Sequence, residues 1–356
     1  LIFLNDGFIQ LQVEKLFRDK VFCRTLIGGP LLSYKGLNLP GVKIFADAVS
    51  DTDLEFVAFA LQEGIDVFGV SFAEIADDIR KVKAFAQKKG QSAYVVAKIE
   101  RAEAIVNFDE IVTAADAIMI ARGDLGVQIP LEDVPVVQKK LINKANLLGR
   151  PVITATQMLL SMTENIRPTR AEVSDVANAI FDGTDAVMLS EETAIGRHPV
   201  EAVEMLAKIA TSTERERKAV SALADLPAYF RTGAGFGNYP VEDLFPLNAV
   251  ESANALNVRY ILSHTQSQSA PCLISRFKPD CWILSCGWDE KTNHFPAMSY
   301  GVYPVRLDVG TNAFTDMSMR FLAEAGMVEK DERVILVEDE STRGRPGTDS
   351  LKIISA

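Results

Sequence analysis

The strongest constraint on the fold is a regular alternation of helical and short apolar segments between residues 47 and 217. In its first repeat, Leu54, Val57 and Leu61 lie on one helical face, and an apolar segment follows. The apolar segments are continuous and rich in Val and Ile, which is typical of parallel strands buried on both faces. We predict these strands at 67–72, 94–99, 117–120, 151–155 and 186–189. They alternate with helices at 76–89, 134–148, 171–181 and 200–217 and with helical segments around 103–114.

Strands that alternate with helices fit either a doubly wound sheet or part of a (β/α)8 barrel. The polar residues favour the barrel, because they follow nearly every predicted strand rather than gathering at one crevice. The chain also lacks the Gly-rich motifs G-x-G-x-x-G and G-x-x-x-x-G-K-[ST]. The residues at the strand ends are Ser71, Lys98 and Glu100, Arg122 and Asp124, Thr156 and Gln157, and Ser190, Glu191 and Glu192.

The rest of the chain divides around this region, which we take as a barrel domain at 42–217. Residues 1–41 show short strands and turns. Residues 218–245, rich in Gly, Pro and Ala, are predicted to be a linker. Residues 246–356 form a smaller α/β unit, with strands predicted at 260–263, 282–285, 302–307, 334–337 and 351–354.

Composition disfavours several classes of protein. The net charge is -11 and no dense Lys/Arg block occurs, so a nucleic-acid partner is disfavoured. No apolar run approaches the ~18 residues of a membrane span, and no basic region precedes the first apolar residues, which disfavours a signal peptide. None of the four cysteines forms a C-x-x-C pair and the three histidines show no ligand spacing, so a cysteine or histidine metal site is not expected.

Charged residues at two neighbouring strand ends point to a metal site. Lys98 and Glu100 are two residues apart and therefore point the same way from a strand. Asp124 follows the next strand, and two carboxylates suit Mg²⁺ or Mn²⁺. Lys98 beside a metal would stabilise a developing oxyanion, and Gly123 lets backbone N–H groups approach an anion. The alternative is a purely structural ion pair at a strand end.

Hydroxyl groups end the last two strands. Thr156 and Ser190 are placed to hold a substrate, or a water molecule that delivers a proton. The alternative is that they cap the helices that follow.

Several long motifs resemble signatures of the pyruvate kinase family, in the family's order, and the resemblance covers essentially the whole chain. It implies a partial TIM barrel made of βα units 4–8, with the end of a small β lid domain before it and a C-terminal α/β domain after it. The motifs are KGLNLPG (35–41), KIE (98–100), ARGDLGVQIP (121–130), PVITATQML (151–159), RPTRAEVSDVANAIFDGTDAVMLSEETAIG (167–196) and HPVEAV (198–203).

The resemblance implies a cytoplasmic glycolytic enzyme that transfers a phosphoryl group from phosphoenolpyruvate to ADP, giving pyruvate and ATP. It implies Mg²⁺ or Mn²⁺ as cofactor, K⁺ whose ligands lie outside this chain, and a homotetramer. The implied catalytic roles fall on Lys98, Thr156 and Ser190. Substrate binding is implied for Lys98, Ala121, Arg122, Gly123, Asp124 and Thr156, nucleotide binding for Lys35, and metal binding for Glu100 and Asp124.

The chain departs from the family pattern in several places. Glu191 stands where many members have glycine. The C-terminal phosphate loop reads Thr265-Gln266-Ser267-Gln268-Ser269 without its glycine, so weak or no activation by a sugar bisphosphate is expected.

The resemblance also implies that three barrel strands and most of the lid precede Leu1. We therefore expect the chain to be a piece of a longer protein and to be inactive by itself, because five βα units cannot close the barrel. Two alternatives are a non-catalytic, truncated member of the family and a metal-dependent lyase that binds phosphoenolpyruvate in a barrel.

Overall fold

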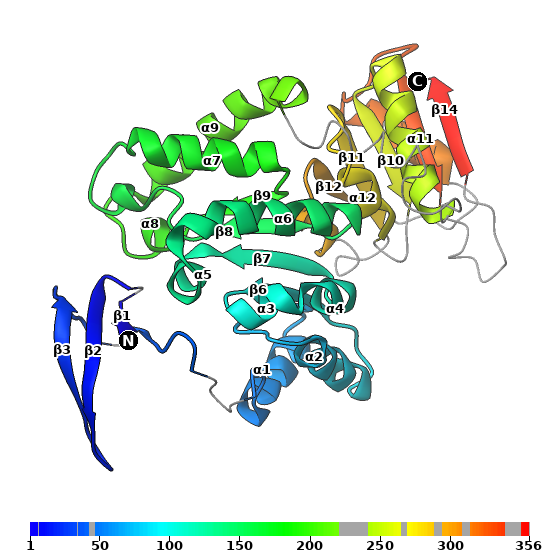
Figure 1. Cartoon of the computed structure of the whole chain (residues 1–356). Helices are drawn as coiled ribbons and strands as arrows, with labels where there is room; N and C mark the ends of the chain where they lie inside the picture. Colours follow the sequence, from blue (N-terminus) through cyan, green and yellow to red (C-terminus); the bar gives the residue numbers. More distant parts are fainter. Residues whose placement is uncertain are drawn as a thin grey trace.

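The computed structural model contains three sheets that follow one another along the chain (Figure 1). Colour in Figure 1 runs from the blue N-terminal sheet through the green central region to the yellow and red C-terminal unit. The structure describes residues 1–5, 7–33, 35–42, 47–220, 241–264, 269–287, 294–307, 314–338 and 350–355.

The N-terminal sheet is small and antiparallel, with strand order β3-β2-β1-β4. Its strands lie in the region where short strands are predicted, and Ile9 on the longest of them is buried. The sheet stands to one side of the central region (Figure 1). Its strands are β1 (Ile2–Leu4), β2 (Ile9–Leu16), β3 (Val21–Ile27) and β4 (Leu37–Asn38).

The central sheet is parallel, and its order β5-β6-β7-β8-β9 follows the sequence. This confirms the five predicted strands and the predicted partial barrel. Among the described residues, the first and last strands each pair with a single neighbour, so the sheet is open at both edges. Its strands are β5 (Val67–Val70), β6 (Tyr94–Ile99), β7 (Ala117–Ala121), β8 (Val152–Ala155) and β9 (Ala186–Met188).

Helices connect the strands of the central sheet. The helical segments predicted around 103–114 are two helices that meet at Asn107, whose side-chain amide donates to the carbonyl oxygen of Glu74 at 2.9 Å. One difference from the sequence prediction is a short helix that follows β7 directly. The helices are α1 (Asp51–Gln62), α2 (Ala76–Lys88), α3 (Ala102–Val106), α4 (Phe108–Ala114), α5 (Arg122–Gln128), α6 (Val134–Leu147), α7 (Arg170–Asp182), α8 (Glu191–Ala194) and α9 (Pro199–Val220), with 3₁₀ turns at Leu131–Asp133 and Leu160–Thr163.

Local sequence fixes both ends of α7. The Thr169 hydroxyl accepts from the Glu172 N–H at 3.2 Å, and the Glu172 carboxylate accepts from the Thr169 N–H at 2.7 Å. This reciprocal pair is a capping box. The helix ends at Gly183, whose φ of 97° suits a residue without a Cβ atom. The position of α7 is therefore defined independently of the site beside it.

The two faces of β6 have different neighbours. Val95, Ala97 and Ile99 pack into the main apolar core with the surrounding helices. Val96 faces the other way and joins a cluster that includes Phe295 of the C-terminal unit. Since side chains alternate along a strand, Lys98 extends from the same inner face as Val96.

The C-terminal unit is a mixed sheet of order β12-β11-β10-β13-β14, in which only the β13–β14 pairing is antiparallel among the described strands. Its strands are β10 (Tyr260–His264), β11 (Trp282–Gly287), β12 (Val302–Arg306), β13 (Arg333–Glu338) and β14 (Ser350–Ser355). Its helices are α11 (Val241–Leu256), α12 (Ser269–Ser275) and α13 (Phe314–Glu324), with a 3₁₀ turn at Pro296–Met298.

A buried ion pair joins this unit to the central sheet. Lys278 Nζ lies 2.5 Å from Asp185 Oδ1, and both side chains are almost fully buried. The Tyr94 and Phe295 rings stack nearby, with their centroids 4.6 Å apart. In the described part of the chain, no helix is long and apolar enough to cross a membrane.

Candidate active site

Lys98 and Glu100 form a tight cluster at the end of β6. Lys98 Nζ lies 2.6 Å from Glu100 Oε1 and donates to the Ser71 hydroxyl at 2.8 Å. Glu100 Oε2 accepts from the backbone N–H of Phe72 at 2.7 Å, and the Glu100 side chain is 1% exposed. The predicted same-side geometry of these two residues is therefore present. The cluster holds a buried carboxylate next to a partly exposed ammonium group.

The first turn of α5 meets the end of β8. The Gly123 N–H donates to Thr156 Oγ1 at 2.7 Å, and that hydroxyl donates to the Ala155 carbonyl oxygen at 2.6 Å. Thr156 and Gln157 have φ values of 69° and 54°, which are unusual for residues with side chains. Both residues turn toward a cavity that also contains Asp124 in its wall.

This cavity of about 450 Å³ lies between the N-terminal sheet and the strand ends of the barrel. It gathers residues that are far apart in the sequence. Five of the predicted site residues line it, namely Lys35, Gly123, Asp124, Thr156 and Ser190. Lys98, Glu100, Ala121 and Arg122 do not line it.

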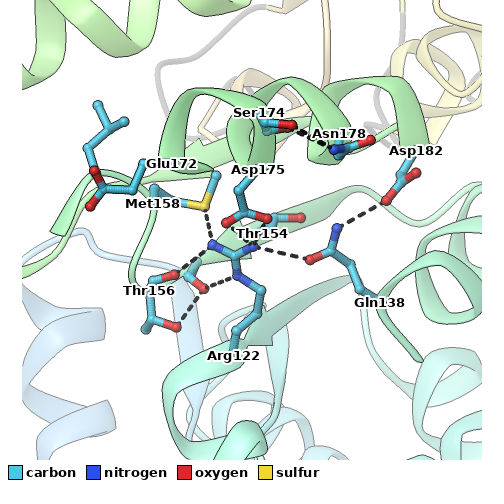
Figure 2. Close-up of polar contacts among 12 residues, drawn as sticks. Arg122, Gln138, Thr154, Thr156, Met158, Glu172, Ser174, Asp175, Asn178 and Asp182 are labelled. Atoms are coloured by element: carbon cyan, nitrogen blue, oxygen red, sulfur yellow. Dashed lines mark hydrogen bonds and ion pairs between the residues drawn. The ribbon is translucent and has the colours of Figure 1, made fainter. Parts of the chain in front are cut away.

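The Arg122 side chain turns away from this cavity into a groove between α6 and α7 (Figure 2). Its Nη1 lies 2.7 Å from Asp175 Oδ2, and its Nη2 donates to the Thr156 carbonyl oxygen at 2.8 Å. The guanidinium is thus committed to protein contacts. Any substrate contact from this residue would have to come from its backbone.

Ser190 is fixed by a neighbour that the sequence assigned no role. The Glu192 carboxylate accepts from the Ser190 N–H at 2.8 Å and from the Leu159 N–H at 3.0 Å. Glu192 is 1% exposed. A buried carboxylate with two backbone donors ties the ends of β8 and β9 together.

The donor chemistry at this end of the sheet fits a hard divalent cation. Glu100 and Asp124 offer carboxylate oxygens from successive strand ends, and Mg²⁺ usually takes only one or two such ligands and completes its shell with substrate and water. The described residues contain no cluster of three or more His, Cys, Asp or Glu side chains suited to a metal. A closed structural metal site of protein ligands alone is therefore absent from that part of the chain.

Comparison with known proteins identifies the family. Residues 1–203 match the family described as "Pyruvate kinase, barrel domain", and residues 247–354 match "Pyruvate kinase, alpha/beta domain". The chain belongs to the pyruvate kinase family. Members of this family are phosphotransferases, and similarity to curated relatives supports this class of enzyme.

The relatives are similar over nearly all of this chain. It is 46% identical to "Pyruvate kinase" of Thermococcus litoralis over 356 residues, covering 99% of this chain and 73% of that protein. The identity is 39% with "Pyruvate kinase" of Staphylococcus epidermidis, of which the chain spans 60%, and 38% with that of Clostridium acetobutylicum, of which it spans 74%. The pyruvate kinase family implies phosphoenolpyruvate and ADP as substrates and a divalent and a monovalent metal ion as cofactors.

One departure from the family pattern has a structural consequence. Glu191, which replaces the frequent glycine, lies 3.1 Å from Lys35 through its Oε1 atom. This ion pair joins the segment between β3 and β4 of the N-terminal sheet to the start of α8, and both residues line the cavity. The phosphate-loop residues 265–268 lie outside the described residues, so the expectation about sugar-bisphosphate activation stays a prediction.

Sequence reasoning missed three side chains at this site. Asp175 and the guanidinium of Arg122 form one pair, and Glu192 holds Ser190. The signal for Glu192 was its position two residues after a strand-end serine. The Arg122–Asp175 contact joins residues 53 positions apart, and neither side chain carries a local signal for it.

Proposed function

We propose that this protein transfers the phosphoryl group of phosphoenolpyruvate to ADP in glycolysis, giving pyruvate and ATP. The observation that carries the proposal is the cavity that brings Lys35, Asp124, Thr156 and Ser190 together from four segments of the chain. Phosphoryl transfer depends mainly on positioning and charge neutralisation, and a cavity lined by a lysine, carboxylates and hydroxyls suits it.

In this proposal the end of β6 stabilises negative charge. Lys98 would stabilise the enolate of pyruvate and the moving phosphoryl group, because its ammonium is partly exposed and anchored by Ser71. Glu100 and Asp124 would hold Mg²⁺ or Mn²⁺, which supplies charge neutralisation when bound. Their oxygen donors match the preference of these ions.

Backbone and hydroxyl groups would bind and protonate the substrate. The backbone of the stretch Ala121–Gly123, at the start of α5, would hold the substrate carboxylate, and the Gly123 N–H would have to leave Thr156 Oγ1 to take part. Thr156 would contact the substrate, and with Ser190 it would position the proton donor to the enolate carbon. Both hydroxyl-bearing residues line the same cavity.

Lys35 would contact the nucleotide from the lid side of the cavity. We further propose K⁺ as the monovalent ion, a cytoplasmic location and a homotetramer, as the family resemblance implies. The domain division that we propose is 1–41 for the end of the lid domain, 42–217 for the barrel, 218–245 for the linker and 246–356 for the C-terminal domain.

Metal titration tests this proposal without requiring turnover. The 356-residue chain should bind Mn²⁺, measured by electron paramagnetic resonance, and oxalate should strengthen binding because it mimics the planar enolate. The Glu100→Gln, Asp124→Asn double variant should lose this affinity. Glu164→Gln, which changes an exposed carboxylate in the same cavity, should retain it. Equal Mn²⁺ affinity in the wild-type chain and the double variant would refute the metal assignment.

The competing function is a non-catalytic member of the family. An assay of pyruvate formation from phosphoenolpyruvate, ADP and Mg²⁺ in the full-length protein separates the two. Pyruvate that forms only with ADP supports the kinase, and no turnover supports the non-catalytic role.

A further inference from the structure

A strained turn forms one wall of the candidate active site. Thr156 and Gln157 follow β8 with positive φ values of 69° and 54°, and both line the cavity. Left-handed conformations at non-glycine residues are unfavourable and persist only where the surroundings hold them. The cost is greatest for a β-branched residue such as threonine. Some group must therefore hold this turn.

The Arg122 guanidinium contacts the turn from one end to the other (Figure 2). Its Nη2 donates to the Thr156 carbonyl oxygen and to the Met158 sulfur, both at 2.8 Å. Its Nε donates to the Ala155 carbonyl oxygen at 3.4 Å. The acceptors belong to Ala155 before the strained pair, to Thr156 within it and to Met158 after it.

Arg122 is itself held rigidly. Its Nη1 contacts both carboxylate oxygens of Asp175, at 2.8 and 2.7 Å, and approaches the Gln138 side-chain oxygen at 3.5 Å (Figure 2). The Arg122 side chain is 9% exposed. Asp175 lies on α7, whose start is fixed by its capping box. The turn is therefore tied through one guanidinium to two helices of the barrel.

We propose that Arg122 is a positioning residue that holds the Thr156–Gln157 turn in its left-handed conformation and so sets the Thr156 hydroxyl in the active site. This inference rests on the proposed function for its catalytic consequence, because it takes Thr156 as a substrate contact. A lysine would not replace this residue. It offers one flexible point charge, whereas the contacts need donors spread over a planar fork.

Hydrogen exchange at one amide reports the position of the turn directly. Gly123 lies in the first turn of α5, where N–H groups have no helical acceptor, so its protection depends on Thr156 Oγ1 at 2.7 Å. Arg122→Lys should speed exchange at the Gly123 amide at least tenfold. The matched control is Lys139→Gln in the same groove, which removes the Lys139–Asp182 pair and should change this rate less than twofold. Unchanged exchange at Gly123 in Arg122→Lys would overturn the proposal.

A second measurement tests the role of strain. Gln157→Gly removes the conformational cost at that position, because glycine adopts positive φ freely. In that background Arg122→Lys should destabilise the chain less than it does with Gln157 present, as measured by urea unfolding. An equal loss of stability in both backgrounds would contradict the idea that Arg122 offsets this strain.

Kinetics of the full-length protein complete the test. A displacement of about 1 Å at a reacting group costs about 10²-fold in rate, so Arg122→Lys should lower kcat by about that factor. The KM for phosphoenolpyruvate should change much less, and Lys139→Gln should stay within twofold of the wild type in both values. If the wild-type protein shows no turnover, the proposed function fails, and Gly123 exchange still decides the positioning role. A kcat for Arg122→Lys within threefold of the wild type would refute that role.

Discussion

The buried Asp185–Lys278 pair should make a large contribution to the stability of the contact between the barrel and the C-terminal unit. Asp185 Oδ1 accepts from Lys278 Nζ at 2.5 Å and from the Tyr300 N–H at 3.0 Å. Its Oδ2 accepts from the Val152 N–H at 2.9 Å. Both oxygens of this carboxylate therefore accept hydrogen bonds, and elements of both units supply the donors.

Asp185→Asn leaves the Lys278 ammonium buried without a counter-ion and places an amide donor where the wild type has an acceptor. Removing one partner of a buried pair costs about 3–5 kcal/mol. That is at least about a fifth of the ~5–15 kcal/mol that stabilises a typical domain. Urea unfolding followed by circular dichroism should show this loss. Glu204→Gln, which breaks the exposed Lys208–Glu204 pair, should cost less than about 1 kcal/mol.

The double variant and the pH dependence refine this prediction. Asp185→Asn combined with Lys278→Met removes both charges, so it should cost less than the sum of the two single variants. Burial lowers the pKa of Lys278 below 10.5, and Asp185 opposes this effect. Without Asp185 the pKa of Lys278 falls further. The folded state then binds fewer protons than the unfolded state, so stability rises with pH. The deficit of Asp185→Asn should therefore shrink as the pH is raised. Strictly additive losses of stability in the two single variants, or a loss below about 1 kcal/mol in Asp185→Asn, would refute the importance of this ion pair.

Three further changes test other parts of the molecule. Lys98→Met in the full-length enzyme should cut turnover by about 10²-fold or more, with a smaller loss of phosphoenolpyruvate binding; near-normal steady-state rates would contradict its role. Glu191→Gly should lower the KM for ADP about two- to fivefold, since it frees Lys35 from a partly exposed ion pair worth up to about 1 kcal/mol; an unchanged KM would argue against nucleotide contact by Lys35. The hydrogen bond from Arg259 lowers the pKa of Glu332 from 4.5 to about 2, so the stability that it contributes is present above pH 4.5 and is lost as the pH falls toward 2. Glu332→Gln should remove that part of the pH dependence of stability, measured in unfolding curves between pH 2 and 6. An unchanged pH dependence would show that Glu332 does not contribute to it.

The strands of the barrel could be predicted from sequence because their signal is local and continuous. The run at 94–99 is apolar except for Lys98, and the structure places β6 at Tyr94–Ile99. The exact residue at which α3 ends and α4 begins could not be predicted in the same way. Asn107 lies between the two helices and donates to the carbonyl oxygen of Glu74, 33 residues away. A tertiary contact of this kind leaves no trace in the local sequence.

The same distinction between local sequence signals and tertiary contacts applies to the candidate site. The Lys98–Glu100 contact could be predicted because period-two geometry alone brings the two side chains to one face. The direction of the Arg122 side chain could not, because a strand end offers it either the cavity or the groove between two helices. Asp175 decides the outcome from another element. Residue type and spacing thus indicated which strand ends carry site residues. Contact partners from other elements decided which of their side chains face the cavity.

The cations proposed to meet substrate are both already paired. Lys98 contacts Glu100 at 2.6 Å, and Lys35 contacts Glu191 at 3.1 Å. Because an unpaired charge is costly to bury, the partly buried Lys98 ammonium is more stable beside the Glu100 carboxylate than it would be without a counter-ion. A phosphorylated ligand would therefore have to compete with a carboxylate for each lysine. Since Glu191 is more exposed than Glu100, the competition should be easier at Lys35. Electrostatic selectivity at this site would then depend on the carboxylate partners as much as on the lysines themselves.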